Sequence, residues 1–234
     1  MSDTGLDEEF GPATWAGIEA AWTSWGRLDQ DVIAPLINPA FMGGPAWPGL
    51  RQAHSITRRT DAILLASSGL ADPTAWDDDE PTNGFEVEVY AIASDLPVDS
   101  DTMTVAGSWL GGVVMAVSNQ VAHLGFQFTD ALAQYGLLTM ALPHVELPDV
   151  SDSYIDSDDG AVVMVGLTDA EIPDTVKGPL SSIRLVNLKL LTRAEGRFCG
   201  SHPEGSAYAR REVARRLVEQ GRPLHSGLDR PSVI

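Results

Sequence analysis

The sequence has few cysteines, only short apolar runs and an acidic start. It contains one cysteine, Cys199, which excludes an internal disulfide and a metal site built from several cysteines. Its apolar runs are far shorter than the roughly 18 residues that a membrane-spanning helix needs. Its first ten residues, MSDTGLDEEF, are acidic and unlike a signal peptide. We therefore expect a cytoplasmic protein.

Motifs that would mark a catalytic centre are also missing. The sequence has no G-x-S-x-G elbow around a nucleophilic serine and no H-E-x-x-H metal motif. The glycines of residues 107–112 are not followed by the Lys-Ser/Thr pair of a phosphate-binding loop. The acidic residues 149–160 lack the glycine and the closing glutamate of a calcium loop. The sequence therefore predicts no catalytic residue, no cofactor and no metal site.

Basic residues are scarce, and they are unevenly placed. Residues 1–183 contain 5 Lys and Arg against 28 Asp and Glu, whereas residues 184–234 contain 10 against 5, within a formal net charge of −18. An acidic body of this kind repels nucleic acid and anionic membranes. It can steer a basic protein partner, since complementary charge accelerates association, although solubility alone also explains an acidic surface.

Hydrophobic periodicity predicts alternating helices and strands. Apolar residues at spacings of three and four predict a helix from Pro12 to the loop that begins at Pro35, with Trp15, Trp22 and Trp25 on one buried face. Further helices are predicted over residues 105–124 and 206–220, and strands over residues 62–66, 85–92, 137–142, 161–167 and 183–191. This order predicts an α+β fold with a mixed or antiparallel central sheet and helices packed on it. We expect one compact domain over residues 12–234, after a frayed acidic segment at residues 1–11.

Residues 85–92, FEVEVYAI, carry the clearest strand signal. Their alternation places Phe85, Val87 and Val89 on a core and predicts that Glu86 and Glu88 face water. Two glutamates on one face of a strand are also compatible with a glycosidase pair, but a solubilising face is the preferred interpretation.

The residues around this strand resemble a known family. Residues 66–73, ASSGLADP, followed by residues 83–89, NGFEVEV, resemble the Suppressor of fused domain, in which a strand ending in Gly-Leu-Ser-Asp-Pro leads to a Gly-Phe-Glu-Leu strand. Ala71 stands where the family usually has Ser. Trp109-Leu110 is similar to the start of the family's middle helix, residues 183–195 to its late hydrophobic strand, and residues 229–233, more loosely, to its C-terminal motif.

The resemblance implies a protein-binding domain without enzymatic activity. The family includes an animal regulator of the Hedgehog pathway and bacterial proteins assigned as immunity partners of polymorphic toxins. It therefore implies an immunity-type protein that binds a toxin domain and covers its active site. The acidic charge favours a basic toxin domain and neither nucleic acid nor membrane as partner. The candidate partner-binding residues are acidic and would mimic phosphate if the toxin is a nuclease: Asp77, Asp78, Asp79, Glu80, Asp152, Asp156, Asp158 and Asp159.

Two alternatives stay open at the level of sequence. One is a small-molecule enzyme with an unrecognised site around Glu86, His123 or His144. The other is a structural subunit of a larger assembly, which an exposed apolar patch would favour.

Overall fold

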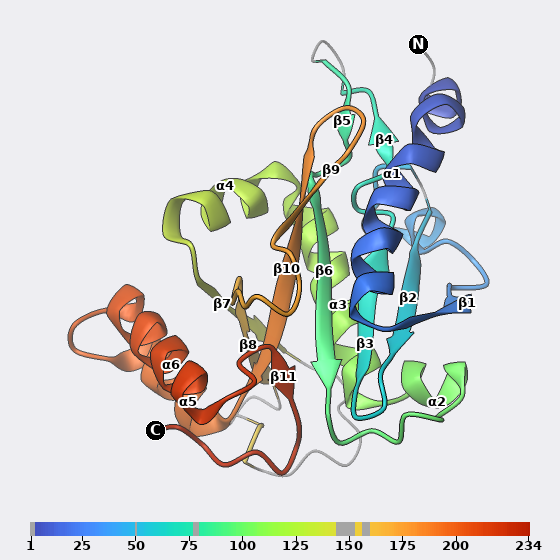
Figure 1. Ribbon diagram of the computed structural model, residues 1–234. Helices are drawn as coiled ribbons and strands as arrows, with labels where there is room; N and C mark the ends of the chain where they lie inside the picture. The colour runs from blue at the N-terminus through green and yellow to red at the C-terminus, as the bar shows by residue number, and fades with distance from the viewer. Residues whose placement is uncertain (1–2, 50, 77–79, 144–152, 156–159) are drawn as a thin grey trace.

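The structure is a computed structural model that describes residues 3–49, 51–76, 80–143, 153–155 and 160–234 (Figure 1). Its helices are α1 (Asp3–Trp25), the 3-10 helix η1 (Pro39–Met42), α2 (Thr102–Ala106), α3 (Trp109–Leu124), α4 (Phe126–Tyr135), α5 (Arg193–Ser201) and α6 (Ser206–Gln220). Its strands are β1 (Arg27–Ile33), β2 (Ala53–Arg58), β3 (Ile63–Ser68), β4 (Pro73–Thr74), β5 (Thr82–Asn83), β6 (Val87–Ala93), β7 (Leu138–Leu142), β8 (Ala161–Val165), β9 (Thr175–Lys177), β10 (Ser182–Leu191) and β11 (His225–Ser226). No helix in these ranges is long and apolar enough to cross a membrane.

Within the described residues, nine strands form one mixed sheet in the order β1-β2-β3-β6-β10-β8-β7, with β11 on β6 and β9 on β10. Strand β6 is central. It pairs antiparallel with β3 on one side and parallel with β10 on the other. Strand β11 pairs parallel with β6 at Ile92 and Ala93, beyond the last β6–β10 pair at Tyr90 and Asn187. The predicted α+β fold with a mixed sheet is therefore confirmed.

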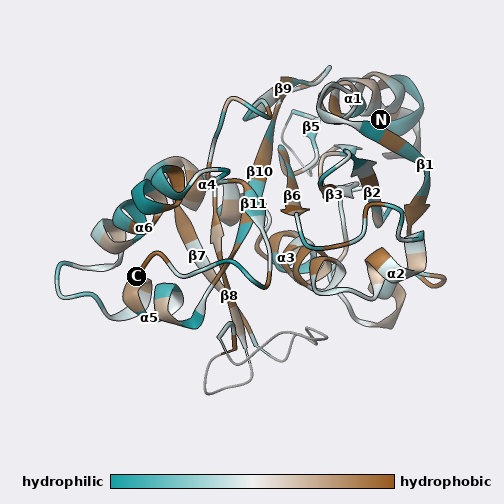
Figure 2. Ribbon diagram, turned by 60° about the horizontal axis from the view of Figure 1, so that its bottom comes forward, coloured by the Kyte–Doolittle hydropathy of each residue, from teal (hydrophilic) through white to brown (hydrophobic). Residues whose placement is uncertain are grey.

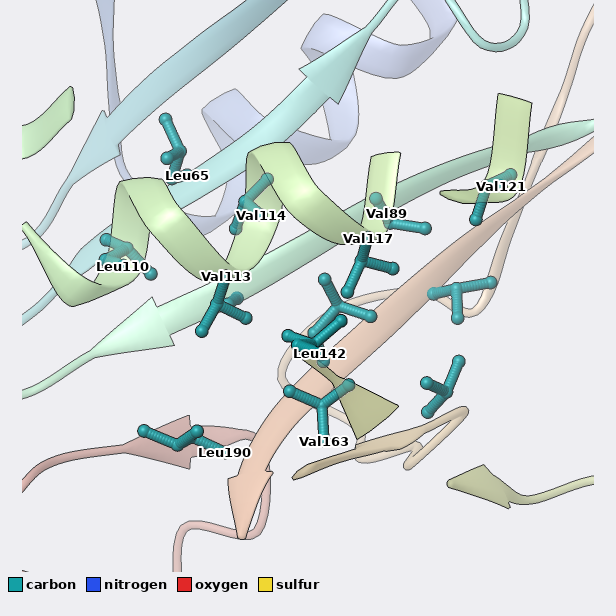
Figure 3. Packing of buried hydrophobic residues seen from close by; sticks show 14 of the residues in the cluster. Leu65, Val89, Leu110, Val113, Val114, Val117, Val121, Leu142, Val163 and Leu190 are labelled. Carbon is teal, nitrogen blue, oxygen red and sulfur yellow. The ribbon is translucent and has the colours of Figure 1, made fainter. Parts of the chain in front are cut away.

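Helices cover both faces of this sheet (Figure 1). On one face, Val113, Val117 and Val121 of α3 pack against Leu65 and other apolar residues of the strands (Figure 3). On the opposite face, α1, α5 and α6 cover a second core. Successive residues of a strand point to opposite faces, so a strand between two helical layers is apolar on both sides. Strand β3 fits this rule, because every residue from Ile63 to Ser67 is buried.

The second helical layer corrects the prediction for Glu88. The sequence predicted that Glu88 faces water, but only 1% of the residue is exposed. The predicted core face is right for Val87 and Val89, which contact the layer of α3. Glu88 points to the other face, on the side of Tyr90, where the second core lies.

The N-terminal helix also differs from its prediction. It begins at Asp3, with Pro12 inside it, and it ends at Trp25. The residues that follow form β1, which the sequence interpretation had assigned to the same helix. Gly26 lies between the two elements, and a side chain does not fit there, because a Cβ would lie 2.6 Å from the carbonyl oxygen of Arg58. The chain approaches the end of β2 at this glycine and turns into the sheet.

Candidate functional site

The residues that carry the family resemblance form a buried polar cluster around Glu88. One carboxylate oxygen of Glu88 accepts hydrogen bonds from the backbone N–H of Gly69 at 2.9 Å and of Ala71 at 3.0 Å. The other oxygen accepts one from the Ser67 hydroxyl, whose oxygen accepts in turn from the Val89 N–H. The strand β6 thus holds the turn that follows β3 through one side chain.

Burial has a strong effect on the acidity of this group. It raises the pKa of Glu88 to about 7, and it outweighs the three hydrogen bonds, which favour the anion. Glu88 lies below the surface and its hydrogen bonds go to its own fold, so we assign it a structural role.

Asp72 and Asn83, which also belong to the stretches that carry the family resemblance, bind the N-terminal helix and a distant turn. The Asp72 carboxylate accepts two hydrogen bonds from Arg51, at 2.9 and 2.7 Å, and one from the Trp15 indole at 3.0 Å. The Arg51 guanidinium lies over the Trp15 ring, 4.6 Å from its centroid. The Asn83 side chain accepts from the N–H groups of residues 180 and 181 and donates to the Thr14 hydroxyl at 2.6 Å. The motif therefore connects α1, β6 and the turn between β9 and β10.

The candidate partner-binding residues predicted from the sequence fall mostly outside the described ranges. This applies to Asp77, Asp78 and Asp79, and to Asp152, Asp156, Asp158 and Asp159. The structure places only Glu80, which is exposed just before β5. Their role in binding stays a prediction.

The structure describes two of the three side chains suggested for an enzyme site, Glu86 and His123. Glu86 is half-buried with a φ of 60°, and His123 is exposed near the end of α3. His144 lies outside the described residues. Cys199 is buried, and burial raises the pKa of its thiol to about 11, so at neutral pH it is not the thiolate that a nucleophile requires.

The structure does present an apolar surface that the sequence interpretation missed. Phe41 and Met42 in η1 are 78% and 77% exposed, and Leu36 and Ile37 just before it are exposed as well. We call these four residues the apolar segment. The sequence does contain a sign of this exposed surface. The four large apolar residues lie among Pro35, Pro39 and two glycines, where a long helix or strand cannot form to bury them. Periodicity alone identified the stretch only as a loop.

The apolar segment follows directly on an edge strand. In the described part of the chain, β1 pairs with β2 on one side and has no strand on its other side. Its register shifts between Leu28 and Val32, and Val32 itself is half exposed. Helix α2 lies next to β1 at the outer edge of the molecule and carries the exposed Met103 (Figure 2). A free strand edge beside exposed apolar side chains is a typical place for another chain to bind.

A mixed sheet covered by helices on both faces defines the class of fold. It is the fold of Suppressor of fused. The structure matches a solved structure described as "the Sufu-Fu complex crystal structure" with a TM-score of 0.60 and 12% sequence identity, over 94% of this chain and 92% of that chain. No family model matches the sequence, and no curated protein matches it. The similarity therefore lies in the fold.

Proposed function

We propose that this chain is a non-enzymatic, cytoplasmic protein-binding domain of the immunity type, which neutralises a toxin domain by covering its active site. The observation that carries the proposal is the apolar segment beside the free edge of β1. The fold adds support, because the similar chain was solved in a complex of two proteins. A sheet edge offers main-chain hydrogen bonds to an extended partner segment, and neighbouring apolar side chains supply the buried contact area.

Charge favours a basic partner. The net charge of −18 attracts a positively charged surface over distances of about a Debye length, roughly 8–10 Å at physiological salt. In this scheme the acidic residues accelerate the encounter, and the apolar segment provides most of the affinity.

The first test changes the apolar segment. We expect the double variant Phe41→Asp and Met42→Asp to bind the natural partner about 30-fold more weakly or worse, because both side chains lose buried contacts and each Asp brings a charge into the interface. The partner is first isolated from native lysate and identified by mass, and its affinity is then measured with purified proteins by calorimetry. Val218→Asp is the control, since Val218 is also exposed but lies on α6. Equal affinity of the double variant and the control would exclude the apolar segment as the binding surface.

The same experiment separates an immunity protein from a structural subunit. A toxin partner must lose its activity when this chain is added, and the double variant must fail to protect it. A partner without inhibitable activity, or a second copy of this chain detected by sedimentation, would instead place the apolar segment in an assembly.

The second test neutralises four acidic residues. Replacing Asp77, Asp78 and Asp79 with Asn and Glu80 with Gln is expected to slow association about tenfold at low salt and to flatten its salt dependence, because long-range attraction acts on the encounter rate. Stopped-flow binding over a range of salt concentrations measures both effects. Glu8→Gln with Glu9→Gln on α1 is a control for charge elsewhere on the chain. Unchanged association rates would remove residues 77–80 from the binding mechanism.

A further inference from the structure

Strands β6 and β10 separate near their carboxyl ends, and a pocket lies beside this separation. They pair in parallel as far as Tyr90 and Asn187, after which β11 takes the place of β10 along β6. Lys189 lies on β10 two residues beyond the last pair with β6. A cavity of about 250 Å³ opens here, lined among others by Ser94, Lys189, Arg222, Ser226, Asp229 and Arg230. Ligands of open sheets that contain parallel strands commonly bind at the carboxyl ends of strands that separate.

Lys189 is an unusual residue for this position. Only 2% of it is exposed, and its Nζ donates a hydrogen bond to the backbone carbonyl of His225. No ion pair joins it to a carboxylate among the described residues, and the nearby Glu195 carboxylate is already bound by the Arg230 guanidinium at 2.6 and 2.8 Å. A lysine placed in this way is a poor structural choice, because a buried ammonium without a counter-ion is costly.

The surroundings favour the neutral amine. Burial is the largest cause and the positive charge of Arg230 adds to it, so that together they lower the pKa of Lys189 to about 7 against the opposing charge of Glu195. A neutral amine is a nucleophile, and desolvation beside another cation is a known way to obtain one at neutral pH. The charged or titratable groups that line this environment come from α5, the turn after α6, β11 and the C-terminal segment: Glu195, Arg222, His225, Asp229 and Arg230.

We propose that Lys189 is the nucleophilic amine of a covalent binding site for a small carbonyl compound that carries a carboxylate, such as a 2-oxo acid. The Nζ lone pair adds to the carbonyl carbon, the C=O π bond breaks, and its oxygen takes a proton to give a carbinolamine. The oxygen then leaves as water with the second amine hydrogen, and an imine remains between Lys189 and the ligand. No oxidant, reductant or metal is needed for these steps.

Arg222 is the residue that selects the carboxylate. Its guanidinium lines the pocket, is half exposed, and pairs through one nitrogen with Asp61 at 2.8 Å. Its other donors can bind an anion near the pocket mouth. The site is separate from the apolar segment, because it lies at the centre of the sheet, where β6 and β10 part, whereas the apolar segment follows the edge strand β1.

The chain offers an internal control, because it contains only two lysines, Lys177 and Lys189. The native protein is incubated at pH 7 with glyoxylate and cyanoborohydride, which reduces an imine to a stable secondary amine, and the labelled peptides are identified by mass. We expect about tenfold or more label on Lys189 than on the exposed Lys177. Labelling of Lys189 should reach half of its maximum near pH 7.

Three comparisons make the result decisive. In urea the preference must disappear, because both lysines then have ordinary surroundings. Lys177→Arg must keep the label and Lys189→Arg must lose it. The labelled peptides of the native protein identify the reacting lysine without either variant. Glycolaldehyde, which lacks the carboxylate, should label Lys189 several-fold more slowly. Label on Lys177 or the N-terminus with none on Lys189 would overturn the proposal, and equal rates for both aldehydes would overturn the role of Arg222.

Discussion

Replacing Glu88 with Ala is expected to lower the free energy of unfolding at pH 7 by about 3–5 kcal/mol. The substitution leaves the N–H groups of Gly69 and Ala71 and the Ser67 hydroxyl without their acceptor in a fully buried place. Each unsatisfied buried group costs about 1–3 kcal/mol, and the space of the lost side chain adds to this. Urea unfolding followed by tryptophan fluorescence measures the loss. Glu86→Ala is the matched control, since Glu86 is half-buried two residues away, and a loss of equal size there would contradict the special role of Glu88.

Glu88→Gln tests the protonation of the same group. The folded pKa of about 7 lies above the ordinary value of 4.5, so the folded protein holds this proton more tightly than the unfolded chain. The stability that Glu88 contributes is therefore full below pH 4.5 and falls as the pH rises towards 7. The loss amounts to about 3 kcal/mol, at 1.36 kcal/mol per pKa unit.

Glutamine has the shape of the protonated acid and cannot ionise, so the Gln variant should lack this slope. The measured quantity is the free energy of unfolding of the native protein minus that of the Gln variant, at several pH values from 4 to 8. We expect this difference to fall by about 3 kcal/mol between pH 4.5 and 7. A difference that stays level with pH would show that Glu88 is an ordinary anion in the folded protein.

The second large effect is expected for Glu195, at the start of α5. Its carboxylate accepts from the Thr192 N–H in a capping box, from Arg230, and from the Val233 N–H at 2.9 Å. Glu195→Ala leaves Arg230, itself mostly buried, without a counter-ion, and we expect a loss of about 3–5 kcal/mol in the free energy of unfolding. Glu219→Ala should cost less than about 1 kcal/mol, because the pair of Glu219 with Arg215 is exposed.

A double-mutant cycle separates the ion pair from the packing around it. Glu195→Met and Arg230→Met are each expected to destabilise the protein by leaving one charge unpaired, whereas the double variant leaves none. The double variant should therefore be at least as stable in urea as the less stable of the two single variants. Losses that simply add would mean that the two side chains act independently.

The regular elements could be predicted from the sequence where their own periodicity identifies them. Helix α6 begins and ends at the predicted residues, and β3, β6, β7, β8 and β10 lie within one or two residues of their predicted bounds. Strand β1 could not be predicted, because the tryptophan spacing of α1 continues into Leu28 without a break. Its strand state depends on pairing with β2, which is tertiary information.

The roles of individual polar residues were harder to predict than the elements. Glu88 has the sequence context of a solvent-facing strand residue, and only the position of the second helical layer reverses this interpretation. Lys189 lies within the strand IRLVNLKLL, where one lysine is usually an edge or surface residue. The burial of both residues depends on which distant segments pack over them, and the local sequence pattern does not contain that information.

The position of β6 has a consequence for how the chain acquires its fold. Its antiparallel partner β3 comes shortly before it in the chain, whereas its parallel partners β10 and β11 begin at Ser182 and His225. During synthesis, the seven residues of β6 therefore expose one unpaired edge until about ninety further residues have been made. Closing so long a loop is slow, and an open apolar edge pairs readily with other chains. We expect the nascent chain to depend on chaperones, and its folding rate to be limited by the arrival of β10.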